Sequence, residues 1–110
     1  MSALKTYAPI EWCPGCGNFG ILNSVEALLQ ELVEEGTPLE NIILVSGVGN
    51  SAKIVDYLHV NSFYSIHGRA LPAAEAIKLA IPDAKVICFV GDGDSYAEGL
   101  DHLIFAAKRN

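Results

Sequence analysis

The sequence predicts an α/β fold in which helices flank a mostly parallel sheet. Two apolar runs rich in β-branched residues, at 42–45 and 86–90, are typical of buried strands, and the second is expected at the centre of a parallel sheet. A shorter run at 62–66 indicates a third strand. Segments with helical spacing alternate with these strands, and this alternation is the usual pattern of a parallel sheet covered by helices.

The N-terminal part of the sequence divides into an arm and a helix. Prolines and glycines interrupt residues 1–17 and predict an irregular arm. Asn18 is predicted to cap a helix that runs to about Glu35, and Gly36 ends it. The apolar residues of this helix recur at helical spacing: Ile21, Leu22, Val25, Leu28, Leu29 and Leu32. The predicted organisation is therefore an arm over 1–17 and an α/β domain over 18–110.

The later elements are placed by the same signals. Each predicted strand ends in a polar, glycine-containing segment, and a segment with helical or turn character follows it. In order they are strand 42–45, a short helix or turn at 52–58, strand 62–66, helix 71–81, strand 86–90, and a helix from Ser95 or Tyr96 to Arg109. Because the last helix should lead into another strand, we expect a domain that continues beyond Asn110.

Composition excludes several classes of protein. The net charge is −6, with 13 acidic and 7 basic residues, which argues against a nucleic-acid partner. No apolar run approaches the roughly 20 residues that span a bilayer, and the N-terminus does not resemble a secretory signal. Three cysteines, an odd number, argue against a disulfide scaffold and for a reducing compartment. We therefore expect a cytoplasmic protein that binds neither nucleic acid nor membrane.

A ligand site is predicted where three glycine-containing segments follow the strands, at 46–51, 67–69 and 91–94. In an open α/β sheet, ligands gather beyond the carboxyl ends of the strands. The third segment has glycines that allow a ligand close to the backbone, and a helix start that favours anions. Asp92 would repel a bare phosphate, which predicts Mg²⁺ between the two. The alternative is an ordinary turn after a strand.

Two cysteines in the arm form a second motif, Cys13-Pro14-Gly15-Cys16. This spacing lets both thiols bind one metal ion or iron–sulfur cluster, or form a redox disulfide. A dithiol oxidoreductase and a pair of unligated turn cysteines remain alternatives. Cys88 lies inside a predicted strand, and we expect it to be inert core.

Five motifs occur in a fixed order along the chain. They are Trp12-Cys-Pro-Gly-Cys-Gly17, Val45-Ser-Gly-Val-Gly49, Ile66-His-Gly-Arg-Ala-Leu-Pro72, Gly91-Asp-Gly-Asp94 and Ala106-Ala-Lys-Arg-Asn110. Together they resemble the N-terminal part of the β subunit of 2-oxoacid:ferredoxin oxidoreductases of the pyruvate synthase type. The resemblance extends from about Ile10 to Asn110.

The resemblance implies a partial thiamine diphosphate-binding fold that acts within a heteromeric enzyme. Such an enzyme oxidatively decarboxylates a 2-oxoacid to an acyl-CoA and CO₂ and passes electrons to ferredoxin. The implied partners are an α subunit, further subunits, ferredoxin, the 2-oxoacid and coenzyme A. Asp92 would be a Mg²⁺ ligand, and Gly91, Gly93 and Asp94 would line the diphosphate. The other walls of the cofactor pocket would be Gly47, Gly49, Asn50, Ser51, His67, Gly68 and Arg69.

The sequence departs from this family at the cluster. The resemblance makes Cys13 and Cys16 two ligands of a [4Fe–4S] cluster, but Asn50 stands where members commonly have the third cysteine. Asparagine is a poor iron ligand, so we expect no intact cluster. A further Mg²⁺ ligand and the glutamate that activates the cofactor are not found in the sequence, so the isolated chain is predicted to be inactive. The alternatives are a cluster-free thiamine diphosphate decarboxylase or carboligase subunit and a truncated, non-catalytic binding chain.

Overall fold

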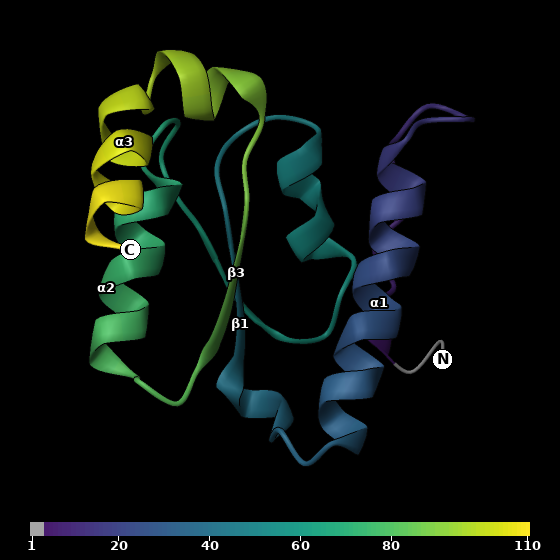
Figure 1. Ribbon diagram of the computed structural model, residues 1–110. Helices are drawn as coiled ribbons and strands as arrows, with labels where there is room; N and C mark the ends of the chain where they lie inside the picture. The colour runs from purple at the N-terminus through teal and green to yellow at the C-terminus, as the bar shows by residue number, and fades with distance from the viewer. Residues whose placement is uncertain (1–3) are drawn as a thin grey trace.

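The computed structural model describes residues 4–110, which form a three-stranded parallel sheet between two layers of helices (Figure 1). The strand order is β2-β1-β3, so β1 is central and pairs with both neighbours. Ser46, the last residue of β1, lies opposite Tyr64 and Phe89, and all three strands therefore end at the same edge. The strands are β1 (Ile42–Ser46), β2 (Asn61–Tyr64) and β3 (Lys85–Phe89). This arrangement confirms the predicted fold class.

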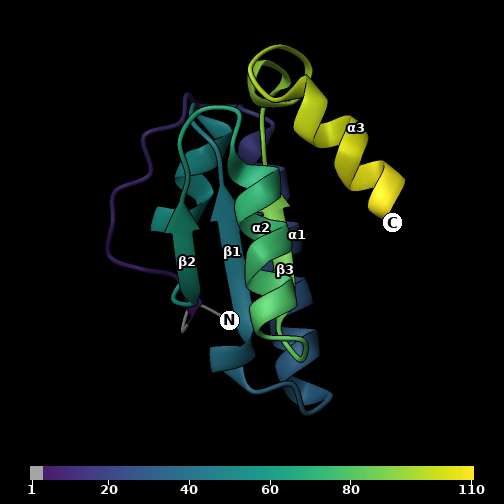
Figure 2. The same ribbon diagram turned by 90° about the vertical axis from the view of Figure 1, so that its left-hand side faces the viewer.

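The helices form one layer on each face of the sheet. The long helix α1 (Asn18–Glu34) and the 3₁₀ helix η3 (Ser51–Asp56) cover one face (Figure 1). Helix α2 (Ala70–Ala80) covers the other face, and α3 (Leu100–Arg109) lies beside α2 (Figures 1 and 2). A short 3₁₀ turn, η2 (Leu39–Asn41), leads into β1. None of the helices within residues 4–110 is both long and apolar enough to span a bilayer.

The main core lies between β1 and the layer that contains α1 and η3. Burial of each large side chain in such a core contributes about 1.5–3 kcal/mol relative to exposure. The small side chains of Ala70 and Ala84 are buried as well but lie outside this cluster. The members of the core cluster are Trp12, Leu22, Leu29, Ile42, Leu44, Ile54, Val55, Tyr57 and Leu58.

The arm of residues 4–17 packs against η3 and the residues after it. Lys5 forms an isolated antiparallel bridge with Leu58, and the Thr6 hydroxyl donates a 2.5 Å hydrogen bond to the carbonyl of Asp56. The Lys53 ammonium lies 2.8 Å from the Glu11 carboxylate. These contacts hold the cysteine motif against the layer that carries the main core.

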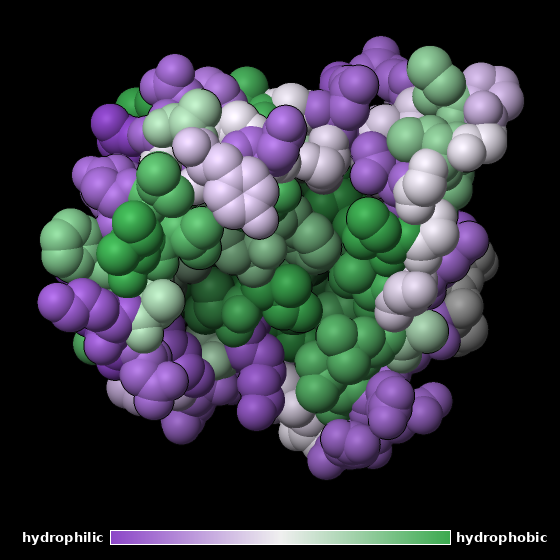
Figure 3. All heavy atoms as spheres, turned by 45° about the horizontal axis from the view of Figure 1, so that its top comes forward, coloured by the Kyte–Doolittle hydropathy of each residue, from purple (hydrophilic) through white to green (hydrophobic). Residues whose placement is uncertain are grey.

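A hollow lies over β3, between α1 on one side and α2 and α3 on the other. Apolar residues gather in the corresponding face of the molecule (Figure 3). The hollow has a volume of about 780 Å³, and its apolar lining includes Leu28, Leu32, Leu79, Val86 and Ile87. The expectation that β3 is the central strand is therefore wrong for the described chain, in which β3 is a half-buried edge strand.

Several boundaries differ from those that the sequence predicts, and three of the differences have a clear structural description. Gly17 precedes α1 without a side-chain cap, and Asn18 is already helical. The strand expected at 62–66 lies at 61–64, because its pairing with β1 stops at Ser46. The last helix begins at Leu100, because a π-helical turn, η4 (Gly93–Ala97), occupies its expected first residues.

Candidate cofactor site at the carboxyl end of the sheet

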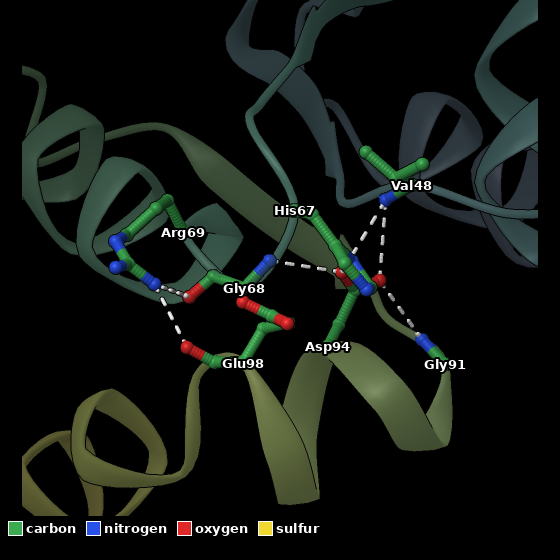
Figure 4. Close-up of polar contacts among 7 residues, drawn as sticks. All are labelled: Val48, His67, Gly68, Arg69, Gly91, Asp94 and Glu98. Atoms are coloured by element: carbon green, nitrogen blue, oxygen red, sulfur yellow. Dashed lines mark hydrogen bonds and ion pairs between the residues drawn. The ribbon is translucent and has the colours of Figure 1, made fainter.

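Asp94 joins the three glycine-containing segments at the carboxyl end of the sheet (Figure 4). The residue is 3% exposed. Its carboxylate accepts hydrogen bonds from the N–H groups of Gly68 at 3.0 Å, Val48 at 3.2 Å and Gly91 at 3.3 Å. Each donor belongs to a different segment, so the segments meet as the sequence predicted. The side chain of Asp94, expected to line a diphosphate, is instead turned inward and holds the loops together.

His67 is the fourth partner of this carboxylate. Its Nδ1 atom is hydrogen-bonded to Oδ1 of Asp94, and 45% of the His67 side chain is exposed. A Cβ atom at position 93 would lie 3.5 Å from Cε1 and 3.6 Å from Nε2 of His67. The outer edge of the imidazole therefore lies beside the glycine turn, within van der Waals distance of the Cβ position of Gly93.

The hydrogen bonds decide the charge of Asp94. Burial acts to raise the pKa of its carboxyl group, but hydrogen bonds from the N–H groups of Gly68 and Gly91, from His67 and from Val48 outweigh burial. The pKa of Asp94 is therefore below its ordinary value. A carboxylate that accepts several N–H bonds stays ionised, because those donors favour its charged form.

Two glycines of the predicted pocket have a packing role. A Cβ atom on Gly47 would lie 2.5 Å from Cγ of Asp94, so any side chain there would displace the carboxylate. Gly68 has φ +78°, and a Cβ atom on it would lie 2.6 Å from the backbone of Glu98. Beside this contact, Nη1 of Arg69 donates a 2.8 Å hydrogen bond to the Glu98 carbonyl (Figure 4). Neither role could be predicted from the sequence, because both depend on residues more than 25 positions away.

Asp92 differs from Asp94 in its surroundings. It is exposed and immediately precedes η4. The first N–H groups of a helical turn have no acceptor within the turn, and for Asp92, Gly93 and Asp94 none is found elsewhere in residues 4–110. Ser51 Oγ lies 3.7 Å from the position of a Cβ atom on Gly91. A carboxylate, a hydroxyl and free N–H groups thus surround one turn, and this donor set fits a diphosphate bridged by Mg²⁺.

The cysteine motif lies near Asn50. The indole Nε1 of Trp12 donates a 2.7 Å hydrogen bond to the Asn50 carbonyl, which brings the motif's first residues to the end of the Gly47–Ser51 segment. Cys13 is exposed, and Cys16 is half-buried with its sulfur 3.5 Å from the N–H group of Asn18. Within residues 4–110, no three His, Cys, Asp or Glu side chains are grouped to hold a metal ion. Two thiolates and an amide do not make the ligand set of a [4Fe–4S] cluster.

The sequence predicted that Cys88 would be buried in the core, but this prediction is wrong. Cys88 is half-buried and lines a cavity of about 190 Å³, whose other walls include Trp12 and Asn18. Burial, and after it the charge of Asp94, raises the pKa of the Cys88 thiol to about 11. The thiol is therefore protonated at neutral pH.

Comparison with known proteins agrees with this geometry. Residues 47–110 match the family described as thiamine pyrophosphate enzyme, C-terminal TPP binding domain. The match begins within the first glycine-containing segment and includes the other two. The 2-oxoacid:ferredoxin oxidoreductase 2 subunit beta of Aeropyrum pernix is 43% identical over 106 residues, which are 96% of this chain and 33% of that protein. The 2-oxoglutarate oxidoreductase subunit KorB of Mycobacterium tuberculosis is 45% identical over 101 residues, 92% of this chain and 26% of that subunit.

A solved structure gives the same result. The 2-oxoglutarate:ferredoxin oxidoreductase from Magnetococcus marinus, with 2-oxoglutarate, coenzyme A and succinyl-CoA bound, superposes with a TM-score of 0.80 at 35% identity. The match covers 90% of this chain and 33% of that chain. The chain thus spans about a third of the length of the curated relatives it matches. It belongs to the family of thiamine pyrophosphate enzymes, whose C-terminal TPP-binding domain matches residues 47–110.

Proposed function

We propose that this chain is the cofactor-binding segment of the β subunit of a 2-oxoacid:ferredoxin oxidoreductase. The observation that carries the proposal is the glycine turn at 91–94, where an exposed Asp92, free N–H groups and the nearby Ser51 hydroxyl form a donor set suited to an anion and its cation. The names of the relatives support the choice of reaction. The substrate class is a 2-oxoacid, with pyruvate and 2-oxoglutarate as the compounds to assay.

Asp92 and the two glycines of the turn would contact different parts of the cofactor and its cation. Asp92 would supply an oxygen ligand to Mg²⁺, which prefers carboxylate and phosphate oxygens. Gly91 and Gly93 would let the diphosphate approach the backbone, where free N–H groups donate to it. When bound, thiamine diphosphate supplies the electron sink for decarboxylation.

The other walls would orient the cofactor and exclude water. Gly49, Asn50 and Ser51 follow β1, and His67 and Arg69 follow β2. Of these, Ser51 lies near Gly91 and His67 lies near Gly93. The oxidation also requires coenzyme A as acyl acceptor, ferredoxin as electron acceptor and an α subunit as structural partner. We assign no electron-transfer step to Cys13 or Cys16, because their ligand set is incomplete.

Calorimetric titration with thiamine diphosphate, with and without Mg²⁺, tests the proposal. Asp92→Asn should weaken Mg²⁺-dependent binding at least tenfold, because the amide carries no charge for the cation. Asp83→Asn is the matched control, since Asp83 is also exposed but lies in the turn before β3, at the opposite end of the strand. Wild-type affinity in the Asp92 variant would mean that Asp92 is only a turn residue.

A further inference from the structure

We infer that Asp94 is a positioning residue that fixes the His67 imidazole, so that Nε2 of His67 faces a ligand at the Gly91–Asp94 turn. This inference deepens the proposed function and rests on it for the identity of the ligand. The orientation of the imidazole does not depend on that function, because it follows from contacts within the chain.

The Asp94 carboxyl group is surrounded by hydrogen-bond donors. Its two oxygens accept N–H groups from Val48, Gly68 and Gly91. Each oxygen already serves as an acceptor, so the carboxyl group offers His67 an acceptor and no donor. The His67 nitrogen that meets it must therefore be the donor, and Nδ1 of His67 carries a proton whether the ring is neutral or charged.

The second ring nitrogen of His67, Nε2, lies near the glycine turn. With Nδ1 engaged, Nε2 is the one ring atom left for hydrogen bonding. The Cβ position of Gly93 lies 3.6 Å from Nε2, and 45% of the His67 side chain is exposed. The free nitrogen thus lies beside the turn that carries Asp92 and the free N–H groups.

The two aspartates of the motif differ in their access to a ligand. Asp94 is 3% exposed and bound on both oxygens, so it is not available to a cation at the surface of the turn. Asp92 is exposed. Asp94 can therefore influence a ligand through His67 and through the loops that it holds, whereas Asp92 can meet the ligand directly.

The first experiment needs no ligand. Nitrogen-15 NMR of the histidine rings in the full chain at pH 8 should find the His67 proton on Nδ1. His59, which is exposed, serves as the internal reference. A His67 ring protonated on Nε2 alone would overturn the inference.

The second experiment measures affinity for thiamine diphosphate with Mg²⁺ by calorimetry. His67→Asn keeps a donor near the position of Nδ1 but loses Nε2, whereas His67→Gln keeps a polar group near the position of Nε2. We expect a loss of about 10- to 100-fold for His67→Asn and a smaller loss for His67→Gln. Equal affinities of both variants and the wild type would overturn the inference.

A double-mutant cycle tests whether Asp94 acts through His67. Asp94→Asn should weaken binding, and adding His67→Asn should weaken it little further; fully additive losses would overturn the inference. The histidine variants decide the question alone if Asp94→Asn does not fold. If the wild type does not bind thiamine diphosphate, the proposed function fails while the NMR result stands. If Asp92→Asn loses affinity and the histidine variants do not, the proposed function stands and this inference fails.

Discussion

Two aspartates that are two positions apart in one motif have opposite environments. Asp92 is exposed, and Asp94 is buried under Val48, Gly68 and Gly91. The sequence alone could not separate them, because the difference depends on backbone donors from distant segments. Ionised Asp94 contributes stability that is present above the ordinary pKa of an aspartate and is lost as the pH falls through its lowered folded-state pKa.

Gly47→Ala tests the contact between this carboxylate and the backbone. The new Cβ atom would lie 2.5 Å from Cγ of Asp94, so the substitution should lower the free energy of unfolding by about 1–3 kcal/mol. Gly20→Ala is the control, because nothing lies within 4 Å of its Cβ position in α1. It should stabilise the chain by roughly 0.5–1 kcal/mol, because alanine favours a helix more than glycine does. Urea unfolding measures both, and a neutral Gly47→Ala would mean that the loops shift freely.

Cys88 should react more slowly with an alkylating reagent than Cys13 does. With a pKa of about 11, about one Cys88 thiol in a thousand is ionised at pH 8, whereas Cys13 is exposed. Mass spectrometry after timed treatment with iodoacetamide should find Cys13 modified at least ten times faster. Equal rates for the two cysteines would contradict the burial of Cys88.

The raised pKa of the Cys88 thiol predicts that the free energy of unfolding decreases in alkali. The unfolded thiol ionises near its ordinary pKa of 9.0, whereas the folded one remains protonated to about 11. The folded state therefore binds more protons between these values, and the free energy of unfolding falls as the pH rises through them. Cys88→Ala should remove this part of the decline. Identical alkaline profiles for the two proteins would contradict the prediction.

At the scale of elements, the alternation of strands and helices was enough to predict the fold class. The β-branched runs at 42–45 and 86–90 became β1 and β3 with shifts of one residue at their ends. The start of α3 was wrong because no local signal distinguishes a π-helical turn from the first turn of an α-helix. After this turn, the backbone of Glu98 and Gly99 packs closely against Gly68, a contact that the sequence does not reveal.

The arm owes its position to Trp12, the largest side chain of the N-terminal segment. Trp12 is 7% exposed and meets Phe19 and Tyr57 edge to face. Trp12→Phe keeps an aromatic ring but loses the hydrogen bond to Asn50, and it should lower the free energy of unfolding by about 1–2 kcal/mol. Phe105→Leu, in the exposed part of α3, should change it by less than about 0.5 kcal/mol. A Trp12→Phe variant as stable as the wild type would mean that the arm does not depend on this contact.

At the scale of the whole molecule, the candidate site lies where all three strands end and where the arm and η3 meet them. Its parts come from four separate stretches of sequence: the arm, the segment after β1, the segment after β2 and the turn after β3. The order of motifs indicated that they act together. Only the fold places Trp12 beside Asn50, and thereby brings the cysteine motif close to Asn50.

From the position of Asn50 beside the cysteine motif, we predict that the chain holds no intact [4Fe–4S] cluster. Such a cluster needs four ligands of the cysteine type, and Cys13 and Cys16 supply two. Asn50→Cys, made in the full chain and co-expressed with the proposed α subunit, should raise the iron content measured after anaerobic purification. Asn61→Cys is the matched control, because it adds a thiol at the start of β2, at the opposite end of the sheet. About four irons per wild-type chain, with the paramagnetic resonance signal of a reduced cluster, would mean that another ligand completes the site and that Asn50 does not prevent assembly.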